Sequence, residues 1–365
     1  MKSSMKFVVA SLAIVMILFL AGCSSAPSVV APATAQPQPD ALTSIPVKLP
    51  PVLNGSGDDL VWQAAPARVL DVTTNGIKPY QVTLKSVYDA DNVYFLVQYP
   101  DITMDVIRSP WVYNADKKTW ERVGDDFGDE DEFGFYWNVS VPNYQVNGCK
   151  DLCHDQDPNN KKMYTPSGTW VDIWQFNGVR SAPMGWMRDM RLTDNPEASE
   201  SGGFVEDEGS TTNPGYADNV QKLGDVEAPA YWKPYSGAGG VIVGDALYLL
   251  QSEIDAGYAK KIVKIDANGT LTDEAGNQVP AFARIPGRIL SAPAGPSWND
   301  IKARGAWLNG VWTIELARKL NTGHADDIQF DTAKPYYFDI YFKTRQAGEV
   351  DRQTLFVSKF VFAKY

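Results

Sequence analysis

Histidine and cysteine are scarce in this chain: its 365 residues include two histidines and three cysteines. A structural zinc site needs about four nitrogen or sulfur ligands, and no second cluster of such residues is present to complete one. Gly-x-Ser-x-Gly, phosphate-binding glycine-loop and His-Glu-x-x-His patterns are also absent. Hydrolase and nucleotide chemistry therefore have no support in the sequence.

One long apolar run is present, and it lies at the N-terminus. Residues 7–20 follow Lys2 and Lys6 and end in Leu20-Ala21-Gly22-Cys23, which is a lipobox. The run is shorter than the ~20 residues that a transmembrane helix needs. We therefore predict a lipoprotein signal peptide over residues 1–22 and lipidation of Cys23. The expected location is the bacterial cell envelope, lipid-anchored, on the periplasmic or outer-membrane face.

Apolar periodicity is missing from residues 23–51, which are rich in Pro, Ala, Ser and Gln. This composition predicts a flexible tether, followed by one folded domain over residues 52–365. Basic residues are outnumbered: the net charge is −11, and it becomes −13 once the two lysines of residues 1–22 are removed. An acidic surface argues against a nucleic-acid partner.

Helical patterns are few, and residues 249–261 hold the best of them. Period-two alternation dominates instead, and such runs typically form strands. The turn pairs Asn268-Gly269 and Asn309-Gly310 are typical of hairpins. We predict an all-β, antiparallel β-sandwich with long loop insertions, including one over residues 197–230. The clearest predicted strands are residues 80–88, 92–99, 133–139, 312–316 and 336–342.

The most distinctive stretch holds two of the three cysteines and one histidine. Cys149 and Cys153 are separated by three residues, and His154 follows directly. The pattern is close to the Cys-x-x-Cys-His sequence of c-type haem attachment, with one residue added. Three interpretations stay open: a Cys149–Cys153 disulfide, covalent haem with His154 as axial ligand, and a non-covalent haem beside a disulfide.

Met163 is our candidate for a second axial ligand, because a thioether is the usual second ligand of a high-potential haem iron. Methionine also serves as ordinary core filler, and Met104, Met184, Met187 and Met190 are competing candidates. A group of aromatic residues further along could line a porphyrin or fill the core of the sandwich. These residues are Trp170, Trp174, Phe176 and Trp186.

Several further motifs stand in a distinctive order and spacing, beginning with an entry motif of Leu53-Asn54-Gly55, Asp59 and residues 62–66. The others are residues 87–95, Asp101, Thr103, Trp111, 148–149, 153–154, Met163, Gly168, 172–174, 310–318 and Leu320. Together they resemble the haem-binding domain of ethylbenzene dehydrogenase γ subunits and related proteins, the cytochrome c-552/DMSO reductase-like haem-binding family. The entry motif is shared with sugar-binding modules of similar sandwich shape, and the fold that the resemblance implies is of this carbohydrate-binding-module or DOMON type.

The resemblance implies a sandwich that holds one haem and passes electrons. In the dehydrogenase subunits the haem is b-type and is held by a Met and a Lys. No lysine here is fixed by a matching motif, and Lys161, Lys162 and Lys302 are candidates. The Cys-x3-Cys-His element belongs to a subset of the family and suggests that His154 takes part instead.

Two functional hypotheses follow. The first is an envelope lipoprotein that binds one haem, of c-type or b-type, and transfers electrons without being an enzyme itself. Cys149, Cys153, His154 and Met163 would hold the cofactor. Its partners would be redox proteins, such as a molybdenum oxidoreductase or a multihaem cytochrome, and the membrane through the lipid anchor. The alternative is a haem-free carbohydrate- or surface-binding sandwich with a Cys149–Cys153 disulfide. We expect His324 to lie in a surface loop, and a role as a second haem ligand is the alternative.

Overall fold

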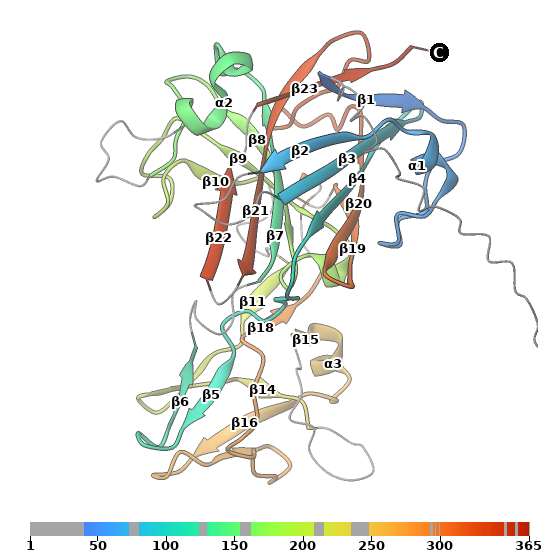
Figure 1. Ribbon diagram of the computed structural model, residues 1–365. Coiled ribbons are helices and arrows are strands. Elements are labelled where there is room, and N and C mark those ends of the chain that lie inside the picture. The colour runs from blue at the N-terminus through green and yellow to red at the C-terminus, as the bar shows by residue number, and fades with distance from the viewer. Residues whose placement is uncertain are drawn as a thin grey trace, which may run out of the picture. The chain divides into compact units, whose positions relative to one another are not determined.

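The computed structural model describes most of the chain from Asp40 onwards (Figure 1). Among the described residues, no helix has the length and apolar character needed to cross a bilayer. The predicted signal peptide and Cys23 lie outside the described residues and stay predictions. The described residues are 40–72, 80–123, 130–153, 162–207, 215–234, 248–292, 295, 297–298, 300–346, 349–354 and 357–364.

Thirteen strands form one continuous sheet, which is the scaffold of the fold. In spatial order they are β10 (Phe204–Glu206), β9 (Arg188–Leu192), β8 (Val171–Asn177), β7 (Glu132–Asn138), β21 (Tyr336–Gln346), β23 (Ser358–Phe362), β1 (Ala41–Pro46), β3 (Tyr80–Tyr88), β4 (Asn92–Pro100), β20 (Val311–Lys319) and β19 (Lys302–Leu308), with β2 (Arg68–Val72) on β3 and β22 (Glu349–Thr354) on β21. Neighbouring strands run antiparallel, except that β1 runs parallel to both β23 and β3.

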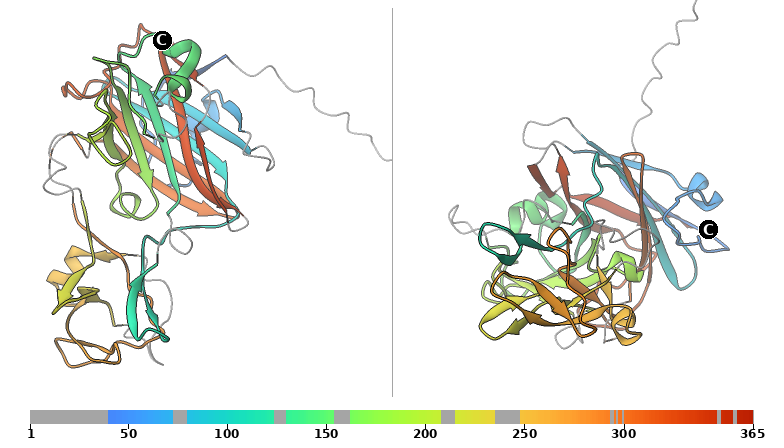
Figure 2. Two further views of the ribbon diagram at one scale, coloured as in Figure 1. Left: turned by 90° about the vertical axis from the view of Figure 1, so that its left-hand side faces the viewer. Right: turned by 90° about the horizontal axis from the view of Figure 1, so that it is seen from below.

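The sheet folds over so that its two halves pack face to face, as Figure 2 shows. Aromatic rings meet across the interior: the ring centroids of Phe95 on β4 and Trp174 on β8 are 5.9 Å apart. Phe176 on β8 and Trp312 on β20 are 5.7 Å apart. One large hydrophobic core therefore lies between the layers. The predicted all-β sandwich is confirmed.

The period-two runs form strands because alternate side chains enter this core. Val82 and Leu84 of β3 are fully buried, as the predicted strand over residues 80–88 requires. The turn between β19 and β20 has positive φ angles at Asn309 (52°) and Gly310 (80°). Such angles suit the right-handed twist of a hairpin, so the Asn-Gly prediction is confirmed there.

Helices are short, and the helix predicted over residues 249–261 is mostly wrong. Only Gln251–Asp255 is helical, and Lys260–Ile265 forms strand β16. The helix ends because Gly257 takes a φ of 72°, which right-handed helix does not allow. The helices are α1 (Leu60–Ala64), α2 (Tyr144–Leu152), the 3-10 helix η1 (Ala182–Met184) and α3 (Gln251–Asp255).

Strand β1 shows that the predicted tether over residues 23–51 extends too far. Ala41–Pro46 lies inside the main sheet, between β23 and β3. Leu42 is fully buried, and the buried hydroxyl of Ser86 donates a hydrogen bond to that of Ser44. The two buried positions of β1, Leu42 and Ser44, include one apolar residue, which is too weak a signal next to a Pro- and Ala-rich stretch. The folded region therefore begins before Val52.

A second hydrophobic core lies among short strands outside the main sheet (lower part of Figure 1). Trp111, Trp120 and Trp232 pack there with Ile262 and Leu271. The loop predicted over residues 197–230 supplies several of these strands, so it is not one irregular loop. The strands outside the main sheet are β5 (Trp111–Asn114), β6 (Thr119–Arg122), β11 (Tyr216–Asp218), β12 (Gln221–Leu223), β13 (Val226–Ala228), β14 (Tyr231–Trp232), β15 (Leu249–Leu250), β16 (Lys260–Ile265), β17 (Leu271–Asp273) and β18 (Arg288–Leu290).

A buried carboxylate joins the two ends of the matching sequence motifs. Glu315 on β20 is fully buried. Its Oε2 accepts hydrogen bonds from the backbone N–H groups of Asn54 (2.9 Å) and Gly55 (2.7 Å). Its Oε1 accepts one from the indole N–H of Trp62 in α1 (2.8 Å). The entry motif and the β20 motif thus form one structural unit.

Removing β1 should destabilise the domain. A chain that begins at Val52 loses the buried Leu42 and leaves β3 and β23 without their shared neighbour. We expect its free energy of unfolding to be at least about 3 kcal/mol lower than that of a chain beginning at Asp40. Urea denaturation followed by circular dichroism measures the difference. Equal stability of the two chains would contradict the assignment of β1.

Removing the Glu315 carboxylate should also destabilise the sandwich. Glu315→Ala leaves two buried donors and one part-buried donor without an acceptor, which should lower the free energy of unfolding by about 3 kcal/mol. Glu227→Ala, on an exposed side chain of β13, is the control and should leave stability unchanged. Thermal unfolding of both variants and the wild type is the measurement, and a loss no larger than the control's would contradict this role.

Candidate functional site

Helix α2 carries the cysteine motif on the outer face of the main sheet. The two sulfur atoms are joined in a disulfide, and both cysteines are fully buried. They pack against side chains that point away from the sandwich core, since Tyr136 and Ile173 alternate with core residues on their strands. The motif therefore lies on the outside of the sheet.

Gly148 allows α2 to approach the sheet closely. It breaks the helix with a φ of 64°, and a Cβ atom there would lie 2.9 Å from Oδ1 of Asp339. The next residue, Cys149, donates its backbone N–H to Oδ2 of Asp339 (2.5 Å). Tyr144 donates its hydroxyl to the same carboxylate (3.0 Å). Asp339 on β21 thus anchors the cysteine helix to the sheet.

The disulfide between Cys149 and Cys153 is part of two of the three interpretations of the motif, the plain disulfide and the non-covalent haem beside a disulfide. Thioether attachment requires each sulfur to be bonded to a vinyl carbon of haem, so it and the disulfide exclude one another. Covalent attachment through Cys149 and Cys153 would need both thiols in the reduced state. A non-covalent haem is compatible with the disulfide.

The structure brings Met163 to the cysteine motif. Met163 packs against the same apolar cluster as Cys149 and Cys153. The next residue, Tyr164, donates its N–H to the carbonyl oxygen of Cys153 (3.0 Å). His154 lies outside the described residues, so its predicted position is untested. Three of the four predicted haem-binding residues therefore lie together.

The aromatic residues considered as a porphyrin wall do not form one surface. Trp174 and Phe176 belong to the core between the layers, on the opposite face of the sheet from the cysteines. Trp186 packs against Trp298 with ring centroids 4.7 Å apart. Trp170 borders a cavity. Three of the four residues thus contribute to packing.

The competing methionines and lysines are spread over the fold. Met104 follows the C-terminal end of β4 and is 48% exposed. Lys302 on β19 lies opposite Ala317 of β20, which in turn lies opposite Tyr94 near the N-terminal end of β4. Met104 and Lys302 therefore lie at opposite ends of these strands and cannot bind one iron. Met187 lies beside Lys302, since its N–H donates to the carbonyl of Ile301.

A cavity of ≈ 580 Å³ lies where β8 begins and β9 ends, beside residues 168–170 and 193–194. Its polar residues include Arg191, Asp194, His324 and Asp326, and Trp170 supplies an aromatic surface. Its size falls within the usual range for small-molecule sites. His324 lies in a surface loop between β20 and β21, as expected, and its half-buried side chain also forms part of the wall of this cavity. Its sequence context held no signal for this role.

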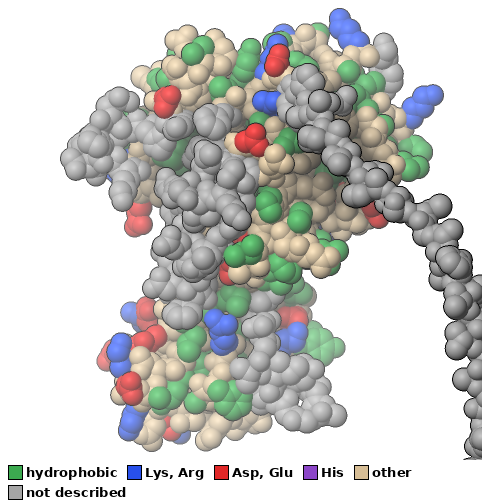
Figure 3. All heavy atoms as spheres, viewed as in Figure 1, with side chains coloured by type: hydrophobic (Ala, Val, Ile, Leu, Met, Phe, Trp, Pro, Cys, Tyr) green, Lys and Arg blue, Asp and Glu red, His purple; other side chains and the backbone are tan. Residues whose placement is uncertain are grey.

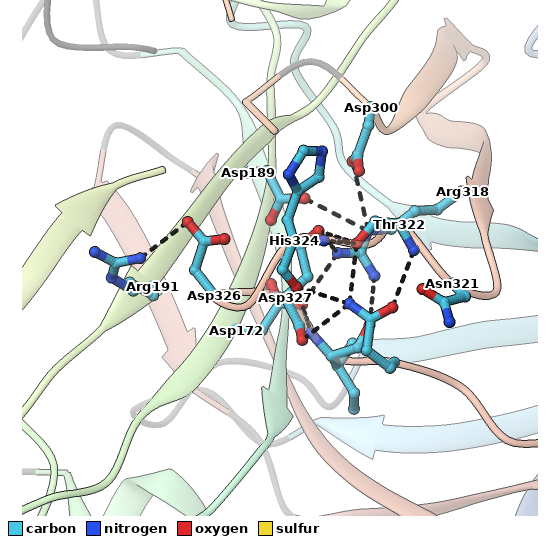
Figure 4. A network of polar contacts seen from close by, with 12 residues as sticks. Asp172, Asp189, Arg191, Asp300, Arg318, Asn321, Thr322, His324, Asp326 and Asp327 are labelled. Atoms are coloured by element: carbon cyan, nitrogen blue, oxygen red, sulfur yellow. Dashed lines mark hydrogen bonds and ion pairs between the residues drawn. The ribbon is translucent and has the colours of Figure 1, made fainter. Parts of the chain in front are cut away.

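A network of buried charges lies beside this cavity (Figure 4). The guanidinium of Arg318 on β20 contacts carboxylates from several segments. Its Nη2 lies 2.8 Å from Asp327 and 3.6 Å from Asp172, and its Nε lies 3.5 Å from both Asp189 and Asp300. Arg318 also donates to the carbonyl of Ile328 (2.9 Å).

Burial shifts the ionisation of this network. It raises the pKa of Asp189 well above the usual range, the pKa of Asp207 to about 9 and that of Asp327 to about 7. Neighbouring carboxylates reinforce each shift. Among the described residues, Arg318 lowers the pKa of Asp189 and Asp327 and Arg191 that of Asp207, but these two cations do not offset the burial of so many acidic groups.

The model of one protein family, described as ethylbenzene dehydrogenase, matches residues 59–342. The chain belongs to the ethylbenzene dehydrogenase family. The match includes the cysteine motif, Met163, the cavity and the Arg318 network. No curated protein matches the chain.

Two solved structures similar to this ethylbenzene dehydrogenase family member come from Caldicellulosiruptor kristjanssonii. Both are of a carbohydrate binding module of family 9. The complex with cellotriose has 7% identity and a TM-score of 0.32, with 88% of this chain and 92% of that chain covered. The complex with glucose has 8% identity and a TM-score of 0.32, with 88% and 96% covered. Similarity at this level bears on neither ligand nor function.

Asp339 should make the stability of this ethylbenzene dehydrogenase family member depend on pH. Burial raises its pKa from 3.8 to about 7. Between pH 3.8 and about 7, the carboxyl of Asp339 keeps its proton in the folded chain but has lost it in the unfolded chain. The free energy of unfolding of the wild type therefore falls as pH rises through this range. Asp339→Asn removes the titration but keeps an acceptor for Cys149 and Tyr144. The variant should gain stability relative to wild type between about pH 4 and pH 8.

Urea unfolding of both proteins across this pH range measures the effect. A difference between variant and wild type that does not change with pH would contradict the raised pKa.

Proposed function

We propose that this ethylbenzene dehydrogenase family member is a haem-binding electron-transfer lipoprotein of the bacterial envelope. Family membership supports a relation to haem domains of this kind. The observation that carries the proposal is the position of Met163, whose side chain shares a buried apolar cluster with the cysteines that precede His154. A thioether in apolar surroundings is a suitable ligand for a high-potential iron.

Haem supplies one-electron chemistry when it is bound. His154 and Met163 would hold its iron, and the apolar cluster around Cys149, Cys153 and Leu152 would exclude water from it. The disulfide favours haem held without thioether bonds, as in a b-type site. The protein itself would not be a catalyst; its partners would be redox proteins such as a molybdenum oxidoreductase or a multihaem cytochrome. Lipidated Cys23 would hold it on the membrane.

A second candidate function follows from the cavity at the end of β8 and β9. Trp170 offers a ring face for a sugar, and Arg191, Asp194 and His324 offer polar groups around it. A haem-free sandwich with the Cys149–Cys153 disulfide would bind carbohydrate there. This function needs neither His154 nor Met163.

The haem proposal predicts a coloured protein. The full chain, produced in a host with an oxidising envelope and haem supply, should show a Soret band and a low-spin spectrum. His154→Ala and Met163→Leu should each abolish the low-spin spectrum. Met104→Leu, on an exposed methionine, is the matched control and should leave it unchanged. Acid–acetone should extract the haem, because the disulfide leaves no thiol for attachment.

Other outcomes separate the alternatives. Haem that resists extraction, and becomes extractable in a Cys149→Ser, Cys153→Ser variant, would contradict the non-covalent arrangement and support c-type attachment. A colourless protein under every condition would overturn the haem proposal. Oligosaccharide binding that is lost in Trp170→Ala would then support the carbohydrate function.

A further inference from the structure

The buried carboxylates around Arg318 have more negative charge than the described residues neutralise. Asp172, Asp189 and Asp327 are at most 3% exposed, and Arg318 is the one buried cation among them. Arg191, on the same face of β9 as Asp189, pairs with Asp326 instead (2.9 Å). Unpaired buried charge is costly, so this site calls for a further positive charge or for bound protons.

Several of the carboxylate oxygens have no hydrogen-bond donor among the described residues. These are Oδ1 of Asp172, both oxygens of Asp189 and Oδ1 of Asp327. Arg318 approaches Asp172 and Asp189 only at 3.6 and 3.5 Å, beyond the length of a charge-assisted hydrogen bond. Each of the three residues therefore keeps an oxygen that could bind a ligand.

Asp207 is a separate observation that points to the same place. Its side chain is 1% exposed, and neither of its oxygens has a hydrogen-bond donor or an ion-pair partner among the described residues. It directly follows β10, where Glu206 pairs with Met190 of β9, so Asp207 lies opposite Asp189. Opposite residues of an antiparallel pair point to the same side of the sheet, so Asp207 is directed towards the carboxylates around Arg318.

The donor set selects the chemical class of ligand. One oxygen from each of Asp172, Asp189 and Asp327 lies within 4.8 Å of the other two. Oxygen-only ligands suit hard cations and not zinc or copper. Ca²⁺ takes six to eight oxygen ligands in a flexible geometry, whereas Mg²⁺ demands a near-ideal octahedron and keeps several waters, so a buried group of carboxylates suits Ca²⁺ better.

We propose that Asp172, Asp189 and Asp327 bind a Ca²⁺ ion, with Asp207 beside it as a further carboxylate. The ion would join strands β8 and β9 to the segment around residue 327. That segment also lines the cavity with His324 and Asp326. The proposal is independent of haem binding, because none of these residues belongs to the cysteine motif.

Terbium luminescence tests this site directly, because Tb³⁺ replaces Ca²⁺ at oxygen sites and emits when a nearby tryptophan is excited. Trp174 is suitably placed: its ring centroid lies 4.9 Å from the guanidinium carbon of Arg318. The full chain, first treated with a chelator, should show tryptophan-sensitised Tb³⁺ emission. Ca²⁺ should displace the emission at lower concentration than Mg²⁺, and Ca²⁺ should raise the melting temperature of the chelated protein.

Variants give the matched comparison. In Asp189→Asn and in Asp327→Asn, the Ca²⁺ concentration needed to displace half of the Tb³⁺ emission should rise by at least about tenfold. Asp339→Asn replaces a buried aspartate elsewhere on the sheet and should retain the wild-type response. If Asp189→Asn does not fold, Asp207→Asn takes its place and should show a weaker Ca²⁺ response than Asp339→Asn.

Two results would overturn the proposal. One is a chelated wild-type chain that shows neither sensitised emission nor a Ca²⁺-dependent rise in melting temperature. The other is an emission that is unchanged in the Asp189 and Asp327 variants, which would place the ion on surface acids.

Discussion

The two layers of the sandwich are joined at one end by a buried polar contact as well as by aromatic packing. Arg318 extends from β20 of one layer to Asp172 and Asp189 on β8 and β9 of the other. Its guanidinium also lies over the ring of Trp174, so the polar network and the aromatic core share a boundary. Neither side can shift without breaking contacts of the other, because a guanidinium has a fixed planar geometry and its partners lie in different strands.

The packed interior limits the places where a cofactor or ligand can bind. The interior between the layers is filled by rings such as Phe95, Phe135 and Trp137, so no cofactor fits there without repacking. The remaining positions are the outer face covered by α2 and the cavity bordered by Trp170 and His324. Both are formed by segments inserted between strands, which is where a rigid sheet usually presents its functional groups.

Sequence patterns located the scaffold better than the sites. Alternation predicted β3, β4, β7, β20 and β21 because one face of each strand enters a continuous core. It missed β1, because one of the two buried positions of that strand is the polar Ser44 and prolines and alanines lie on either side. Cys149, Cys153 and Met163 were recognised as a group because they are close in sequence. The Arg318 network could not be recognised, since Asp172 and Asp327 are separated by 155 residues and only folding brings them together. Proximity of that kind leaves no local pattern to read.

The parallel pairing of β1 has a mechanical consequence. Any tension on the chain ahead of Asp40 enters the domain through this strand, which lies between β23 and β3. A pull along its axis would load the hydrogen bonds on both flanks together, in shear, and would not open them one after another. A protein fixed to a surface through its N-terminal segment would therefore resist being peeled apart, and the sheet would yield only when whole rows of bonds fail at once.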